Sequence, residues 1–177
     1  MADFKPAFAF VLQHEDPSGS GVITEDAGGR TRFGIASKFH PELTEEFFTG
    51  PAEEALAEAE RIEEQEYWDA MRLAELANQN VANKLFDMGV NMGVRQASIY
   101  AQRAANLFLS RTASGAEQRL AEDGVIGAKT LAAINSCDPR ELCQTLCELS
   151  EAHYRHVVAV NPAQAVNLKG WLKRASA

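Results

Sequence analysis

The sequence predicts a mostly α protein: a bundle of seven or eight helices with one small irregular β-hairpin after the first helix. Apolar residues recur at helical spacing along most of the chain. Capping residues next to prolines mark several helix starts. The only run of glycine-rich turns with β-prone residues lies between residues 16 and 29. With 177 residues, 46% hydrophobic and 24% charged, the chain has an ordinary globular composition and is long enough to bury a core.

The first helix is predicted to run to about His14, with Asp3 as its N-cap. Pro6 falls in the first turn, where its missing N–H does least harm. Four apolar residues recur at helical spacing along this segment: Phe4, Phe8, Val11 and Leu12. The turn-rich segment 16–21 ends the helix, and residues 22–29 form the expected hairpin.

Three longer helices are predicted in the middle of the chain. An Ala/Glu-rich pattern runs to Trp68, capped by Thr49 and opened by Pro51. A second helix carries one apolar stripe, formed by Val81, Leu85, Met88 and Met92. Residues 99–108 suit a third helix, whose alanine-rich faces allow close packing.

The last third of the chain is also predicted to be helical. Residues 130–134 form a short helix. The run 138–141 combines a capping aspartate, a proline at the first helical position and a glutamate at the third, and predicts a helix that reaches about Val160. Asn161-Pro162 repeats this device for a terminal helix that carries Trp171.

The net charge of −8 is concentrated in one segment. Residues 42–66 hold ten glutamates and one arginine, while the rest of the chain holds fifteen acidic and sixteen basic residues. An acidic arm without a compensating basic stripe makes nucleic acid an unfavoured partner. We interpret the arm as a solvated helix face.

No apolar stretch approaches the length that a membrane span needs. The first residues lack the basic region, unbroken apolar core and cleavage site of a signal peptide. We therefore expect cytoplasmic synthesis without a membrane span, and an action on the cell wall would require release or export.

The three cysteines are interpreted as buried structural thiols, and no metal is expected. Cys137, Cys143 and Cys147 have no CxxC spacing, although the last two share a helix face. His153 and His156 form the only close histidine pair, which is read as a solvated face.

Glu15 is the first candidate for chemistry, because it stands where a helix ends and a glycine-rich loop begins. A carboxyl half-buried there would keep its proton near neutral pH, as the acid in glycoside hydrolysis must. A solvated surface glutamate is the alternative.

A second carboxylate is available across the hairpin. Glu25 and Asp26 lie about ten residues after Glu15, and a hairpin brings them back toward it. Gly28-Gly29 allows a bulky sugar to approach the backbone, and Thr31 carries a hydroxyl that orients water. Ordinary turn chemistry is the alternative for this loop.

Several ordered motifs resemble a known family. The segments are 11–15 (VLQHE), 26–35 (DAGGRTRFGI), 85–93 (LFDMGVNMG) and 123–130 (DGVIGAKT), with Tyr67-Trp68-Asp69 and a final Gly-Trp-Leu-Lys-Arg at 170–174. Together they are similar to the muramidases of glycoside hydrolase family 108, whose members are labelled secretion activators or lysozyme-like endolysins. The resemblance covers nearly the whole chain.

The resemblance implies a lysozyme-like fold that hydrolyses the β-1,4 bond between N-acetylmuramic acid and N-acetylglucosamine by acid–base catalysis without a cofactor. The order Glu15, Asp26, Thr31 is also similar to that of phage-type lysozymes. That analogy implies Glu15 as the acid, Asp26 as the electrostatic or basic partner and Thr31 as the positioner of water. The family resemblance also implies a catalytic region over residues 1–109 and a peptidoglycan-binding region over 110–177 packed on it; one compact domain is the alternative. The enzyme would act on the periplasmic cell wall. One departure is that Asp16-Pro17-Ser18 stands where the family has Gly-Gly-Tyr.

Four further residues are candidates for sugar binding. Asp87 and Asn91 lie one helical turn apart, and Tyr67 and Trp171 offer aromatic faces; each is also consistent with a structural role. Two rival functions stay open. One is a non-catalytic murein-binding protein, and the other is an interaction subunit of a secretion apparatus or of a phage lysis system with its holin.

Overall fold

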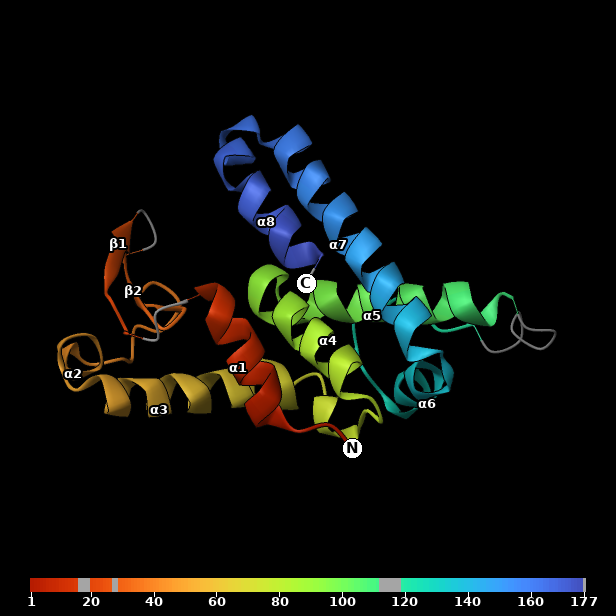
Figure 1. The fold of residues 1–177 in the computed structure, drawn as a ribbon, viewed down its shortest axis with the longest axis horizontal. Helices are drawn as coiled ribbons and strands as arrows, with labels where there is room; N and C mark the ends of the chain where they lie inside the picture. The colour runs from red at the N-terminus through yellow and green to blue at the C-terminus, as the bar shows by residue number, and fades with distance from the viewer. Residues whose placement is uncertain (16–19, 27–28, 112–118, 177) are drawn as a thin grey trace.

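The computed structural model describes residues 1–15, 20–26, 29–111 and 119–176 and confirms the mostly α class (Figure 1). In chain order its elements are α1 (Phe4–Glu15), β1 (Thr24–Asp26), β2 (Gly29–Arg32), β3 (Ile35–Ala36), α2 (Glu45–Thr49), α3 (Ala52–Glu63), the π-helix η1 (Glu64–Asp69), the 3-10 helix η2 (Leu73–Glu75), α4 (Gln79–Met92), α5 (Val94–Leu109), α6 (Ala128–Ser136), α7 (Pro139–Val160), the 3-10 helix η4 (Pro162–Asn167) and α8 (Leu168–Ala175).

The β structure after α1 is a three-stranded antiparallel sheet in the order β1-β2-β3. The predicted hairpin is therefore present, and β3 is an addition. Phe33 and Gly34 join β2 to β3 with φ values of 49° and 84°, the left-handed pair that a tight hairpin turn requires. The Phe33 ring lies where a Cβ on Gly21 would be, so residue 21 must be glycine for this ring to pack.

The molecule has two hydrophobic cores. The larger core is built around α4, which lies at the centre of Figure 1 with α1, α5 and α7 packed against it. The smaller core joins the sheet to α2 and α3 and consists of Phe33, Ile35, Phe47, Phe48, Ala55, Ala59 and Ile62. Leu12 and Leu56 pack against both cores, so α1 and α3 link the sheet end of the molecule to the helical body.

The prediction for the helix ending at Trp68 was wrong in detail. Thr49 is the last residue of α2 and its hydroxyl donates to Glu45 O, so it does not cap the next helix. Phe47 and Phe48 are buried beneath the sheet, and this tertiary contact stabilises a short helix that local propensity does not reveal. The long helix also changes to a π-helix from Glu64 onward.

The predicted start of α7 is confirmed. Asp138 Oδ1 accepts hydrogen bonds of 3.0 Å from the backbone N–H groups of Arg140 and Glu141, and Pro139 opens the helix. The similar run at Asn161-Pro162 begins the 3-10 helix η4 instead, and the Asn161 side chain makes no capping bond. α8 follows and lies antiparallel beside α7, and its last residue, Ala175, contacts α4 (Figure 1).

Candidate active site

Glu15 is the last residue of α1, and the next described residue is Ser20. Phe4, Phe8 and Val11 are buried in the main core, which fixes the axis of α1. Leu12, one turn before Glu15, packs against both cores. The backbone of Glu15 therefore stands at the boundary of the helical body and the sheet. Its side chain lies outside the described part of the structure, as does the whole segment 16–19.

The register of β1 and β2 relates Asp26 to Thr31. Thr24 pairs with Thr31 and Asp26 pairs with Gly29, while Glu25 pairs with Arg30. Directly paired residues and residues two apart share a face of a sheet. Positions 26 and 31 therefore belong to one face, and position 25 belongs to the other. The side chain of Asp26 is not among those described.

The face that carries position 25 is covered by α2. Arg30 donates two hydrogen bonds to the Glu45 carboxylate, at 2.6 and 2.7 Å, and its guanidinium lies 4.5 Å from the centre of the Phe48 ring. Arg32, on the same face, is buried and donates to the carbonyl oxygens of Phe47 (2.7 Å) and Gly50 (3.0 Å). The face of Asp26 and half-buried Thr31 is thus the one turned away from α2.

Arg32 is a residue whose role the sequence did not suggest. Its guanidinium also donates to Gly21 O at 3.1 Å, so one side chain ties the segment before β1, the sheet and α2 together. An arginine beside polar neighbours in a short strand looks solvent-exposed in a sequence. Its alternation with Arg30 on a single face was the available signal.

Asp87, a candidate for sugar binding, lies under α8 and is 1% exposed. Its Oδ1 accepts from Arg174 Nε at 2.5 Å. Burial raises the pKa of Asp87. The positive charges of Arg174 and Lys84 lower it and so oppose that rise, and His14 on α1 also lowers it. The geometry gives Asp87 a structural contact, and its role in sugar binding stays a prediction.

Lys84 belongs to the same cluster. It is 4% exposed, and its Nζ donates to the carbonyl oxygens of Arg174 (3.2 Å) and Ala175 (2.6 Å) at the end of α8. A cation at a helix C-terminus satisfies carbonyls that have no partner within the helix. Lys84 and Asp87, one turn apart on α4, therefore both bind the last turn of α8.

Asn91 and Trp171 meet at Tyr154 on α7. Asn91 Nδ2 donates to the Tyr154 hydroxyl at 2.8 Å, and the Trp171 ring stacks on the Tyr154 ring with centroids 5.2 Å apart. Both Asn91 and Trp171 are half-buried. Tyr67, also half-buried, lies in the π-helix η1 against the main core. The structure thus brings Asn91 and Trp171 together and leaves Tyr67 on a separate element.

The thiols are only partly as expected. Cys137 is buried, which raises its pKa to about 11, whereas Cys143 and Cys147 are half-buried and line a pocket. Burial also raises the pKa of Cys143. Within the described residues no group of three or more His, Cys, Asp or Glu side chains has the geometry to hold a metal.

Comparison with known proteins decides the family. Residues 8–93 match the model described as Glycosyl hydrolase 108, and residues 96–176 match the one described as Predicted Peptidoglycan domain. The chain is a glycosyl hydrolase 108 domain followed by a peptidoglycan domain. It is also similar to the solved structure titled "Structure of Brucella abortus SagA", with a TM-score of 0.70 and 23% identity over 98% of this chain and 89% of that one, a likeness of fold alone. No curated protein matches it.

This glycosyl hydrolase 108 domain makes the chain a glycoside hydrolase, and the pairing with a peptidoglycan domain makes peptidoglycan its substrate and partner. The two matched segments meet at Gly93 to Arg95, where Gly93 takes a φ of 87° between α4 and α5. The division expected between residues 109 and 110 stays a prediction. None of the helices described is long and apolar enough to cross a membrane.

Proposed function

We propose that this peptidoglycan hydrolase is an N-acetylmuramidase that cleaves the β-1,4 bond between N-acetylmuramic acid and N-acetylglucosamine. Glu15 is the general acid, Asp26 is the second carboxylate and Thr31 positions the water. The observation that carries the proposal is the strand register. Positions 26 and 31 share the sheet face turned away from α2, while Glu15 ends the helix that joins the two cores.

The chemistry needs only proton transfer by two carboxyl groups. Glu15 donates its proton to the glycosidic oxygen as the bond from that oxygen to the anomeric carbon breaks. Asp26 stabilises the positive ring that develops or takes a proton from the attacking water. The water oxygen then bonds to the anomeric carbon, and Thr31 holds that water by its hydroxyl. The acid in such a reaction must keep its proton near neutral pH, and partial burial of a carboxyl group is the usual way in which an enzyme achieves this.

A suspension of purified peptidoglycan tests the proposal. The wild-type protein is expected to clear the suspension while new reducing ends appear, and the released sugar at the new end should be N-acetylmuramic acid. If the protein sediments with the wall and no reducing ends form, it is a murein-binding module. New ends at N-acetylglucosamine would contradict the bond assignment.

The acidic arm favours a second, additional role as a contact surface. Glu53 and Glu54 are exposed on the first turn of α3, and most glutamates between residues 42 and 66 face solvent. A basic partner in a secretion or lysis apparatus, including a holin, would fit this surface. Pull-down from cell extract with wild-type protein and with Glu53→Gln/Glu54→Gln tests it: equal recovery of partners contradicts the role. The site of action proposed for the enzyme is the periplasmic cell wall, which it reaches after release from the cytoplasm.

A further inference from the structure

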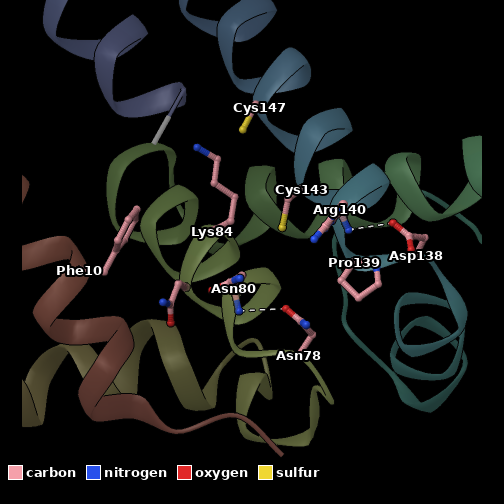
Figure 2. Close-up of a pocket in the computed structure, with 10 residues that line it drawn as sticks. Phe10, Asn78, Asn80, Lys84, Asp138, Pro139, Arg140, Cys143 and Cys147 are labelled. Carbon is pink, nitrogen blue, oxygen red and sulfur yellow. Dashed lines mark hydrogen bonds between the residues drawn. The ribbon is translucent and has the colours of Figure 1, made fainter.

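A pocket of about 520 Å³ lies between α1, the start of α4 and the start of α7, and the proposed reaction does not use it (Figure 2). Figure 2 shows Phe10 at one side and Cys143 and Cys147 at the other, with Lys84 between them. α4 belongs to the glycosyl hydrolase 108 domain and α7 to the peptidoglycan domain. The pocket therefore forms where the two domains pack together.

Most of the polar groups still available in this pocket are hydrogen-bond donors. Asn78 Oδ1 accepts from the backbone at the start of α4, and Asn83 Oδ1 accepts from Gln79 Nε2 at 2.7 Å. Among the described residues, nothing accepts a hydrogen bond from the NH₂ groups of Asn78 and Asn83 or from the guanidinium of Arg140. The side chain of Asn80 is likewise uncommitted and exposed.

Several acceptors in the pocket are already used. The Asp138 carboxylate caps α7 through Arg140 N and Glu141 N. The Lys84 ammonium donates its hydrogen bonds to carbonyl oxygens of α8, but it still contributes positive charge to the pocket wall. In a chain of net charge −8, this wall presents two cations and one capped carboxylate. Such a site favours a ligand with carboxylates and carbonyl oxygens.

The remaining wall is apolar and suits small side chains. Phe10, Pro139 and the two cysteines line it, and the volume lies in the range of pockets that enclose small ligands. Phe10 also has an edge-to-face contact with His14, with ring centroids 5.2 Å apart, so the aromatic surface continues along α1 toward Glu15. Glu15 lies five positions after Phe10 along the helix, which corresponds to a rise of about 7.5 Å.

We infer that this pocket binds the peptide stem that N-acetylmuramic acid carries. The stem is a short peptide of small residues with free carboxylates, and it would extend from a sugar held at the end of α1. Its carbonyl and carboxylate oxygens accept from Arg140 and from the amide groups of Asn78, Asn80 and Asn83, and its side chains lie against Phe10 and the thiols. The inference rests on the proposed cleavage beside N-acetylmuramic acid, and it adds recognition of the peptide to recognition of the glycan.

Calorimetric titration with N-acetylmuramoyl tetrapeptide, compared with N-acetylmuramic acid alone, tests the inference. The wild-type protein should bind the peptide-bearing sugar more tightly. Arg140→Gln/Asn80→Ala removes the positive charge of Arg140 and the side-chain amide of Asn80. It should weaken that binding by about tenfold or more, since a charged hydrogen bond contributes on the order of 1.5–3 kcal/mol. Arg155→Gln, an exposed arginine farther along α7, is the matched control and should bind as the wild type does.

Equal affinity for the two ligands, or unchanged affinity in the double variant, would overturn the inference. Neither ligand contains the bond to be cleaved, so this result is independent of whether the proposed reaction is correct. On whole peptidoglycan the double variant should raise KM, while kcat on glycan strands stripped of peptide should not change. A fall in kcat on the stripped strands would place these residues in the reaction and would also contradict the inference.

Discussion

Asp87, Arg174 and Lys84 are charged side chains that the fold buries, at 1%, 9% and 4% exposure. Each has a partner in the same cluster. The Asp87 carboxylate accepts a hydrogen bond from Arg174 Nε, and Lys84 Nζ donates to the last carbonyl oxygens of α8. Buried charge is tolerated only when it is paired and hydrogen-bonded. At the scale of single residues, the polar groups of α4 thus serve to dock the C-terminal helix.

Replacing Asp87 with alanine should destabilise the protein strongly. The change leaves the Arg174 guanidinium buried without its carboxylate, and breaking a buried pair in this way costs about 3–5 kcal/mol of unfolding free energy. Denaturant unfolding measures this change. Glu151→Ala, which removes a looser exposed pair with Arg155, is the control and should have little effect. If Asp87→Ala keeps its stability but loses hydrolysis, Asp87 contacts the sugar instead.

His153 gives the protein a pH-dependent stability. It is partly buried beside Tyr100 and Tyr154, and burial lowers its pKa, with a smaller contribution from the charge of His156. Because the folded pKa is depressed, the unfolded chain binds the proton more readily. The stability is therefore fully present above the ordinary histidine pKa of about 6.5 and is lost as pH falls through the folded value.

The melting temperature should fall between pH 7.5 and pH 5.5, and His153→Gln should make that fall smaller. Thermal unfolding at the two pH values measures both. His156→Gln changes an exposed ring and should alter the fall less. A fall of equal size in wild type and His153→Gln would show that other groups are responsible.

The sheet and α2 form a small structural unit in which one buried side chain, Arg32, makes several of the connecting hydrogen bonds. Arg32 joins Gly21, Phe47 and Gly50 through hydrogen bonds of 2.7–3.1 Å, and the small core below it contains seven buried apolar residues among those that the structure describes. A unit with so little apolar contact should open more readily than the body.

Arg32→Met should therefore loosen the sheet more than the rest of the molecule. The methionine keeps the apolar stem and removes all three hydrogen bonds. Hydrogen exchange should show faster exchange at β1 and β2 amides, with α4 and α5 nearly unchanged. Arg30→Met, which removes the more exposed pair with Glu45, should have a smaller effect. Equal protection of the sheet in Arg32→Met and wild type would contradict the role given to Arg32.

The helices differ in how well their positions can be predicted from local sequence signals. The starts of α1 and α7 follow from local cues, a capping aspartate and a proline in the first turn, and both were predicted. α2 depends on Phe47 and Phe48 meeting the sheet, and no cue within its five residues reports that contact. The change to a π-helix after Glu63 also could not be predicted from the spacing of apolar residues.

At the scale of the whole molecule, the two cores meet at the end of α1, and the candidate site lies there. Glu15, Asp26 and Thr31 were chosen from local motifs, and the strand register adds the common face of the last two. The partner of Asp87 could not be found in this way, because Arg174 is 87 residues away in the sequence. Long-range pairing decides whether a polar residue on a helix is structural or free for substrate.

The central claim is that Glu15 supplies the proton for glycan cleavage, and Glu15→Gln tests it most directly. The amide keeps the size of the side chain but has no useful acidity. The release of reducing ends from purified peptidoglycan, measured across pH, should fall by about 10²–10⁴, with wall binding and melting temperature nearly unchanged. The alkaline limb of the wild-type pH profile should be absent from any residual activity, since that limb reports loss of the proton from the acid. Hydrolysis by Glu15→Gln at the wild-type rate would contradict the account.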